Sequence, residues 1–299
     1  MAKKKQTVEE SKYSTFYKKN YKKFMIIPIL LFIFSIIMIT NTLKNENSPI
    51  YRDVTLKGGL SATLEIEPTV EEYQLQKQLE DLFPQNSFSV LFKAENGKNV
   101  GYIITTDIKE EQLKPKLEQI FETKINQDNY SSRFISPKLS NAFFKQAMIA
   151  LGFSFLFMSL VVFLYFRELV PSSAVVLSAI FDIIVTVGIL DLLEFKLSVA
   201  GIGAIIMLVG YSIDTDVLLT NRLVKEKGDN YFEKTFFAFK TGSLMSLTTL
   251  IAGIGAIIFT NAAIIFEIAF ILAIGLAVDY ISTWIQNTGI LLWWLEKKN

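Results

Sequence analysis

The chain has 299 residues, of which 51% are hydrophobic, and its formal net charge at pH 7 is +1. It contains no cysteine and no histidine, which excludes disulfides, thiol nucleophiles, histidine-containing metal sites and imidazole acid–base catalysis. The mean hydropathy of +0.36 reflects apolar runs of roughly 20 residues, the length that a bilayer core requires. The sequence therefore predicts a polytopic α-helical membrane protein, and it predicts neither a metal site nor a cofactor.

A strongly basic N-terminal segment precedes the first apolar run. Eight lysines fall within residues 1–23. Because lysine and arginine accumulate on the cytoplasmic side of membrane proteins, we expect residues 1–23 to be cytoplasmic and residues 24–40 to be the first membrane span. The sequence that follows this run is a poor cleavage site, which favours a retained anchor over a signal peptide.

Residues 41–142 are largely polar and are predicted to form a separate domain between the first two spans, on the extracytoplasmic side. The expected elements are a strand at 54–67, a helix at 69–83, strands at 88–92 and 100–105 around the turn residues Asn96 and Gly97, a helix at 108–123 and a strand at 130–135. The order βαββαβ is typical of a ferredoxin-like α+β unit, which packs two helices on one face of an antiparallel sheet.

Residues 143–299 are predicted to form a membrane domain with five further spans and a short cytoplasmic C-terminus. The spans are expected at residues 147–166, 172–193, 197–220, 236–259 and 264–283. Basic residues gather in the loops on the side of the N-terminus, whereas the opposite loops hold few charges. Six transmembrane helices in contact with membrane lipids, with both termini in the cytoplasm, therefore account for the whole chain, which we expect in the cell membrane.

Five ionisable side chains lie well inside the predicted spans and are the candidate functional residues. They are Asp182, Asp214, Asp216, Lys240 and Asp279. A charged group at bilayer depth is costly, so each is expected to face protein or water. We interpret the set as a protonatable network, in which Asp214 or Asp216 carries an exchangeable proton and Lys240 modulates it.

The two acids of the fourth span are predicted to lie on different faces of one helix. Since a helix turns by about 100° per residue, Asp214 and Asp216 point in nearly opposite directions. Asp214 continues a stripe formed by Gly203, Met207 and Gly210, whose small residues allow a neighbouring helix to approach closely. Asp216 instead shares a face with Ser212 and Thr220.

Structural roles for the same residues are also compatible with the sequence. Asp182 and Asp214 could make hydrogen bonds that only join helices, and Asp216 and Lys240 could form an ion pair near the interface. Glu267 lies close to the outer surface and is expected to be interfacial.

Several short motifs are similar to the SecF branch of the SecD/SecF family of protein-export membrane proteins, within the resistance-nodulation-division superfamily. The matching residues are Asp53, Gly58 and Gly59 after the first span, and Gly210, Tyr211, Ser212 and Arg222 in the fourth. The Asp-Thr-Asp sequence at 214–216 is similar to archaeal members. The common bacterial motif has its aspartate at the position of Thr215 and a fifth-span arginine at the position of Thr241.

The resemblance implies a subunit of a protein-export complex and no enzymatic activity. A SecD-like subunit would supply six further spans, and the other expected partners are the Sec translocon channel and the translocating polypeptide. A gradient of protons or other ions would assist translocation. No nucleic-acid partner is expected, and no glycine-rich phosphate loop provides a site for ATP.

Three other functions are compatible with the sequence. The first is an independent small-molecule efflux pump of the same superfamily, although the chain has half of the expected spans. The second is an intramembrane aspartyl protease that uses Asp216 and Asp279, although the Gly-x-Gly-Asp signature of one such family is missing. The third is a passive scaffold of the translocon, without coupling to an ion gradient.

Overall fold

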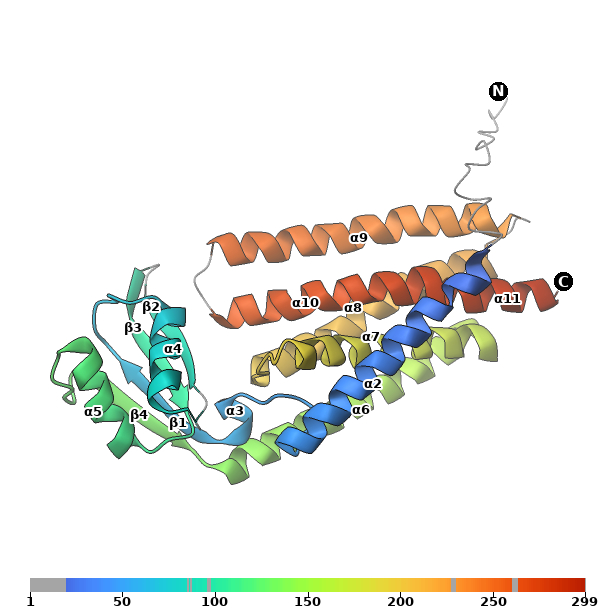
Figure 1. The fold of residues 1–299 in the computed structure, drawn as a ribbon. Helices are drawn as coiled ribbons and strands as arrows, with labels where there is room; N and C mark the ends of the chain where they lie inside the picture. Colours follow the sequence, from blue (N-terminus) through green and yellow to red (C-terminus); the bar gives the residue numbers. More distant parts are fainter. Residues whose placement is uncertain are drawn as a thin grey trace.

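A computed structural model describes residues 20–84, 86, 88–95, 98–226, 230–259 and 263–298. Most of the basic N-terminal segment and the predicted Asn96-Gly97 turn lie outside the described residues. The described part consists of a bundle of long helices and a small α+β domain beyond one end of the bundle (Figure 1). We call that end the domain end. Helix α2 begins at the opposite end, and α11 ends there.

Six helices in the described part are long and apolar enough to cross a membrane. They are α2 (Ile26–Glu46), α6 (Pro137–Phe166), α7 (Leu169–Leu192), α8 (Val199–Val224), α9 (Tyr231–Phe259), and the continuous run of α10 (Ala263–Ile281), η1 (Ser282–Asn287) and α11 (Thr288–Lys298). This number agrees with the six apolar runs of the sequence. The helices extend beyond several of the predicted spans, because the polar residues at their ends continue the helix past the apolar run.

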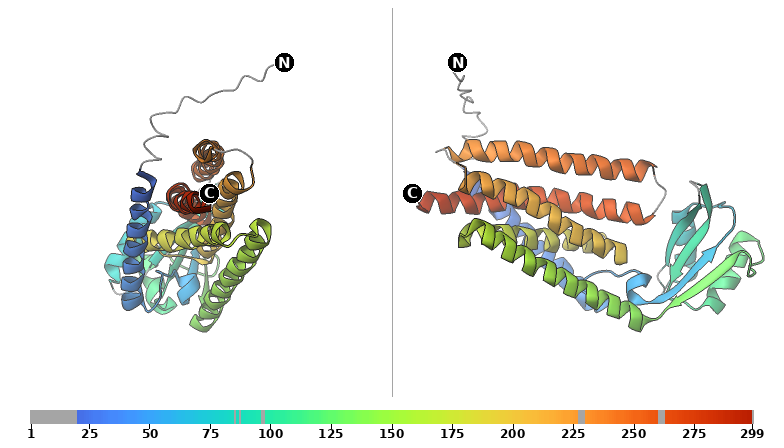
Figure 2. Two further views of the ribbon diagram at one scale, coloured as in Figure 1. Left: turned by 90° about the vertical axis from the view of Figure 1, so that its right-hand side faces the viewer. Right: turned by 180° about the vertical axis from the view of Figure 1, so that it is seen from behind.

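Helices α7 and α8 form the centre of the bundle, whereas α2, α6 and α9 cover it with most of their surface exposed. Helix α9 lies on the outside, beside α8 and α10 (Figure 2). Helices α2 and α7 approach closely, since a Cβ placed on Gly188 would lie 2.5 Å from the Cβ of Ser35. Small residues at such a crossing are typical of helices that pack within a membrane.

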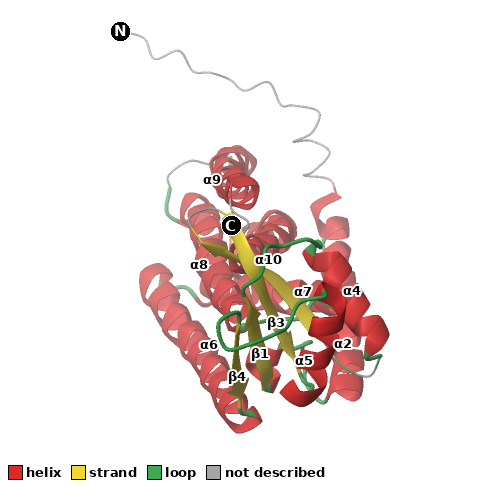
Figure 3. Cartoon of the chain, turned by 90° about the vertical axis from the view of Figure 1, so that its left-hand side faces the viewer, coloured by secondary structure: helices red, strands yellow, loops and turns green. Residues whose placement is uncertain are grey.

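The α+β domain lies between α2 and α6 in the sequence. Its elements are α3 (Val54–Lys57), β1 (Gly59–Leu64), α4 (Glu72–Leu82), β2 (Phe88–Glu95), β3 (Lys98–Thr106), α5 (Glu110–Phe121) and β4 (Tyr130–Ile135). The strands form an antiparallel sheet in the order β2-β3-β1-β4 (Figure 3). From β1 onward this is the order of strands and helices expected from the sequence. The first strand was expected at 54–67, but residues Val54–Lys57 form α3, because Asp53 caps a helical turn there, and the strand covers only Gly59–Leu64.

One face of the sheet packs against α4 and α5 to form the core of this domain. Alternate residues of β1 point into it because successive side chains of a strand point to opposite faces. Its fully buried members include Ala62 and Leu64 from β1, Tyr102 and Ile104 from β3, Leu75 and Leu79 from α4, and Leu113 and Leu117 from α5. The repeat of four residues in each helix keeps both leucines on one face. The core therefore forms within this domain, separately from the helix bundle.

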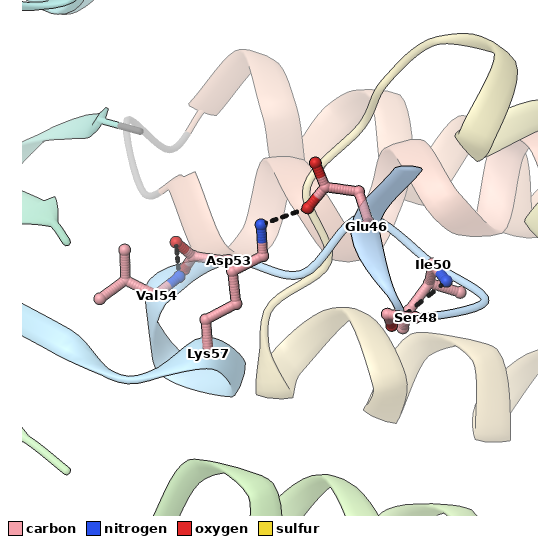
Figure 4. A network of polar contacts seen from close by, with 6 residues as sticks. All are labelled: Glu46, Ser48, Ile50, Asp53, Val54 and Lys57. Atoms are coloured by element: carbon pink, nitrogen blue, oxygen red, sulfur yellow. Dashed lines mark hydrogen bonds and ion pairs between the residues drawn. The ribbon is translucent and has the colours of Figure 1, made fainter. Parts of the chain in front are cut away.

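The segment that joins α2 to β1 connects the domain to the bundle. Asp53 accepts a hydrogen bond from the Val54 N–H at 2.5 Å and so caps the short helix α3. The backbone N–H of Asp53 donates to the carbonyl of Leu197, between α7 and α8, and the Leu197 N–H donates to the carbonyl of Tyr51, both at 2.8 Å. Burial raises the pKa of Asp53. Figure 4 shows Asp53 next to the ion pair between Lys57 and Glu46, whose atoms lie 2.6 Å apart.

Two glycines follow α3 at positions that only glycine fits. Gly58 and Gly59 have φ values of +90° and +153°, a region that L-residues with a Cβ rarely adopt. A Cβ on Gly58 would lie 2.6 Å from the Cα of Pro137 at the start of α6, and one on Gly59 would lie 2.4 Å from the carbonyl oxygen of Thr106. Both ends of the domain therefore meet at one point next to α6.

The Tyr130 phenol in β4 gives a titration test of the α+β domain. Burial, together with the nearby Glu110 charge, raises the pKa of Tyr130 to about 12. The folded chain keeps this proton at pH values where an unfolded tyrosine loses it, so this contribution to stability is present below pH 10 and is lost as the pH rises through about 12. In an ultraviolet titration of the full chain, we expect one tyrosine to ionise only near pH 12, and Tyr130→Phe should remove this part of the phenolate signal. Loss of a signal near pH 10 in Tyr130→Phe instead would contradict this expectation.

Candidate functional site

Three carboxylates from three different helices meet in the middle of the bundle. Asp182 comes from α7, Asp216 from α8 and Asp279 from α10, and their exposed fractions are 1%, 0% and 0%. We call these three residues the buried carboxylate cluster. All three were predicted as site residues, although the sequence alone did not indicate that they contact one common set of side chains.

Serine and threonine hydroxyls connect Asp182 with Asp279. Asp182 accepts hydrogen bonds from Ser212 and from Ser282, each at 2.5 Å. The Ser282 hydroxyl also lies 3.2 Å from the carbonyl oxygen of Asp279. The Thr215 hydroxyl lies 3.1 Å from each carboxylate oxygen of Asp279 and 2.9 Å from the carbonyl of Ser212. Asp279 is therefore linked to both α7 and α8.

A second set of contacts connects Asp279 with Asp216. The Thr283 hydroxyl lies 3.0 Å from Oδ1 of Asp216 and 3.1 Å from Oδ1 of Asp279. Asn287 donates to the same Asp216 oxygen at 2.6 Å. The other carboxylate oxygen of Asp216 is buried, and among the described residues no donor meets hydrogen-bond geometry with it. Asp279 thus occupies the central place in the cluster.

A π-helical turn positions the residues that surround the cluster. Residues Ser282–Asn287 form η1, and the hydroxyl of Thr288 donates to the carbonyl of Thr283, five residues back, at 2.9 Å. Asn287 follows Asp279 by eight residues, and in a regular α-helix two side chains at this spacing point about 80° apart around the helix axis. The wider π turn reduces this angle, so that Asn287 lies on the same side of the helix as Asp279. The turn therefore brings Asp279, Thr283 and Asn287 to the same neighbour, α8.

Lys240 is not brought to the cluster. Its side chain is exposed on α9, and no hydrogen bond or ion pair engages it among the described residues. The predicted depth of Lys240 along the membrane normal is similar to that of Asp279, but depth does not specify which way a side chain points. The structure therefore gives no support to the interpretation that Lys240 modulates a buried acid.

Asp214 also lies outside the cluster, as the helical angle predicts. It is exposed, together with Gly203, Met207 and Gly210, whereas Asp216 faces inward. Asp214 borders a cavity of about 230 Å³ between α8, α9 and α10. The residues that line this cavity are Tyr211, Asp214, Thr215, Met245, Ser246, Thr248, Thr249 and Leu276. Thr215 is thus shared by the wall of the cavity and the buried cluster.

The motif residues of α8 have separate positions around this site. Ser212 binds Asp182 and Tyr211 lines the cavity, while a Cβ on Gly210 would meet no atom within 4 Å. Arg222 lies 3.8 Å from Glu226, which follows the end of α8. Thr215 places a hydroxyl between the two acids of the Asp-Thr-Asp sequence, and this hydroxyl contacts the carboxylate of Asp279 from α10.

Glu267 has a structural role that its position near a helix end did not reveal. Its carboxylate accepts from the Ser198 N–H at 2.8 Å and from the Ser198 hydroxyl at 2.7 Å. Ser198 in turn caps the first turn of α8 by accepting from the Ala200 N–H at 3.0 Å. Glu267 therefore fixes the domain end of α8 against α10. The sequence predicted an interfacial position for Glu267 but not this contact between two helices.

Hydroxyl and amide groups that were not predicted from the sequence complete the cluster. These are Thr215, Ser282, Thr283 and Asn287. A signal was present in the last span, because Asp279, Thr283 and Asn287 recur every four residues and so fall near one face of a helix. Among the described residues, no group of three or more acids is arranged to hold a metal ion.

The sequence matches a known family over well over half of its length. Residues 114–297 match the family described as protein export membrane protein SecD/SecF, C-terminal. The protein-export membrane protein SecF of Methanocaldococcus jannaschii is 36% identical over 288 residues, which cover 93% of this chain and 97% of the relative. SecF of Methanothermobacter thermautotrophicus is 36% identical over 287 residues, covering 94% and 95%.

A solved structure shares the fold. The crystal structure of SecDF, a translocon-associated membrane protein from Thermus thermophilus, matches 94% of this chain with a TM-score of 0.66 and 18% sequence identity. The chain spans only 38% of the length of that SecDF. The similarity in sequence extends over nearly the whole of the archaeal relatives. The chain therefore belongs to the SecD/SecF family of protein-export membrane proteins.

Proposed function

We propose that this chain is the SecF-type subunit of a SecD–SecF complex that assists protein export and is driven by protons entering the buried carboxylate cluster. The chain covers 97% and 95% of two relatives that are named SecF. Its role in protein export follows from this similarity. The proton coupling depends on the structure of the site.

The observation that carries the coupling is a set of three buried acids that contacts no base in the part of the chain that the structure describes. There, the side chains that donate hydrogen bonds to Asp182, Asp216 and Asp279 are neutral serine, threonine and asparagine. Three negative charges in a low-dielectric environment repel one another strongly. Bound protons remove this repulsion, so the number of protons in the cluster changes when the helices move apart or together. Such acids inside membrane proteins are typical of proton relays.

The expected orientation places the α+β domain outside the cell membrane and both termini in the cytoplasm. The lysine-rich N-terminal segment and the basic residues of the loops at that end support this orientation through the positive-inside rule. Substrate polypeptides would then emerge on the side of the α+β domain. The Sec translocon channel is the proposed neighbour in the membrane.

A separate SecD-like subunit is the proposed principal partner. The chain matches 38% of the SecDF polypeptide, in which the remaining 62% has no counterpart here. A subunit of the SecD type would supply that remainder. An independent efflux pump is less well supported, because it would have to function with this smaller part alone.

We propose no enzymatic activity. Asp216 and Asp279 are close enough to share contacts with the Thr283 hydroxyl, so their proximity alone is compatible with an aspartyl dyad. A protease must also bring a water and a peptide to both acids. Both are fully buried, and the neighbouring cavity is separated from Asp279 by Thr215. The arrangement suits proton exchange better than peptide cleavage.

The proposed function is tested by purifying the tagged chain and reconstituting it in membranes together with the proteins that co-purify with it. We expect mass spectrometry to identify a SecD-like subunit and the translocon channel. In proteoliposomes that contain this assembly, an imposed pH gradient is expected to accelerate export of a substrate and to be dissipated as export proceeds. Co-purification without any effect of the gradient would favour the passive scaffold, and solute transport by the chain alone would favour the pump.

A further inference from the structure

Four buried oxygen atoms in the middle of the bundle have no partner that meets hydrogen-bond geometry among the described residues. They are Oδ2 of Asp216, Oδ1 of Asn287 and the hydroxyl oxygens of Ser178 and Thr220. All four residues have an exposed fraction of 0%. Buried polar atoms are rarely left without a partner, so each of these oxygens requires an explanation.

The four residues belong to three helical segments that meet at Asp216. Asn287 of η1 donates to Oδ1 of Asp216 at 2.6 Å, and the hydroxyl of Ser178 on α7 lies beside the same carboxylate. Thr220 follows Asp216 by four residues on α8, so both side chains are on one face of that helix. We call these four residues the Asp216 oxygen site. Their common position indicates one ligand that the described part of the chain does not supply.

The other carboxylate oxygens of the buried cluster already have contacts. Each oxygen of Asp182 accepts from a serine hydroxyl, and each oxygen of Asp279 lies 3.1 Å from the hydroxyl of Thr215. Within the described part of the cluster, Oδ2 of Asp216 is the carboxylate oxygen for which no such contact has hydrogen-bond geometry. A ligand of the cluster is therefore expected at Asp216.

The chemistry of the site suits a monovalent cation. All four atoms are oxygens that offer lone pairs, and hard cations prefer carboxylate and carbonyl oxygens. Calcium takes six to eight oxygen ligands, and magnesium keeps several waters, whereas this site has one carboxylate and three neutral oxygens. Buried charges in proteins are paired or bind metal ions, and in the described part of the chain no base contacts Asp216. A sodium ion would offset its single charge.

An irregular helix contributes to the site. Asn287 is the last residue of the π turn η1, and π turns within α-helices are frequent at functional sites. Sodium sites of membrane transporters likewise lie near the middle of the bilayer, where helices depart from regular α geometry. The π turn thus provides the amide oxygen of the site in the same way as it positions the donor to Asp216.

We propose that the Asp216 oxygen site binds a sodium ion through Asp216, Asn287, Ser178 and Thr220. This inference goes beyond the proposed function, in which protons enter the cluster, and shares with it only the cluster. Sodium and a proton are alternatives at Asp216, because either one offsets its charge. The chain would therefore bind two kinds of cation in the middle of the bundle.

Equilibrium binding of radioactive sodium to the purified complex tests the proposal. The tagged chain is purified with its co-purifying proteins, and choline replaces sodium at constant ionic strength. We expect one saturable sodium ion per chain, which Asp216→Asn abolishes. Ser178→Ala and Thr220→Val each remove a hydroxyl, and each should raise the sodium concentration at half saturation by about tenfold or more.

Thr186→Val is the matched control for these substitutions. The Thr186 hydroxyl is also fully buried, and no described group meets hydrogen-bond geometry with it. It follows Ser178 by eight residues on α7, which is about 12 Å along the helix. Valine at this position should leave sodium binding unchanged. A loss equal to that in Thr220→Val would contradict the position of the site.

The other outcomes separate this inference from the proposed function. Saturable binding that Ser178→Ala and Thr220→Val leave unchanged would contradict the assignment of the ligands, and equal displacement by potassium and by sodium would contradict the choice of ion. A complex without saturable sodium binding, whose export still responds to a pH gradient, would contradict the inference and leave the proposed function intact. Sodium binding by a complex whose export ignores that gradient would contradict the proton coupling alone.

Discussion

Replacing Asp279 by asparagine is expected to remove the effect of a proton gradient on export while the complex stays assembled. Asparagine has nearly the shape of aspartate and can still accept from Thr215 and Thr283, but it cannot bind and release a proton. Proton transfer by a positioned side chain typically contributes about a hundredfold or more to a rate, so the gradient-dependent part of the export rate should fall by at least about tenfold. The measurement is export per assembled complex in proteoliposomes with and without the gradient.

Two comparisons make this result specific to the cluster. Asp216→Asn, which alters the acid that shares Thr283 with Asp279, should act in the same direction. Glu233→Gln, which removes an exposed acid of α9, should have no effect. Full stimulation by the gradient in a double variant with Asp216→Asn and Asp279→Asn, present at the normal level, would exclude these two acids as the proton carriers.

Alanine in place of Gly59 is expected to destabilise the α+β domain. The φ of +153° strains any residue with a Cβ, and the added methyl group would lie 2.4 Å from the Thr106 carbonyl oxygen and 2.6 Å from Val54. Backbone strain and overpacking of this kind each cost about 1 to 3 kcal/mol. A loss of about 2 kcal/mol corresponds to roughly 30-fold faster exchange through domain opening. Hydrogen exchange of the amides of β1 and β3, followed by mass spectrometry, measures this change.

The control for this substitution is Gly152→Ala. Gly152 is helical and its Cβ position is open, so alanine there should leave the exchange of β1 and β3 unchanged. If Gly59→Ala also left these rates unchanged, the close contact between β1 and Thr106 would not limit the opening of the domain.

The sequence predicted those features that depend on local geometry. The thickness of the hydrocarbon layer sets the length of an apolar run, so six runs indicated six helices. The angle between successive residues of a helix separated Asp214 from Asp216, and the structure places one outside and the other inside. The strands and helices expected from the sequence also follow the order of the α+β domain from β1 onward.

The features that depend on packing between helices could not be predicted in the same way. Asp182 and Asp279 are far apart in the sequence, and their common contact with Ser282 depends on how α7 and α10 are rotated about their axes. Lys240 has a suitable depth but belongs to the outermost helix, α9. The π turn at Ser282–Asn287 was not predicted either, since the apolar run that indicates a span does not distinguish a π turn from an α-helix.

The α+β domain joins the helix bundle where Gly58 meets Pro137. The domain is joined to the bundle by the chain that enters β1 and the chain that leaves β4, and these two connections cross where a Cβ on Gly58 would lie 2.6 Å from Pro137. A further contact, from the Asp53 N–H to the Leu197 carbonyl, joins the segment that enters β1 to the segment that enters α8. The entry to β1, the exit from β4 and the entry to α8 are therefore held in contact at the domain end.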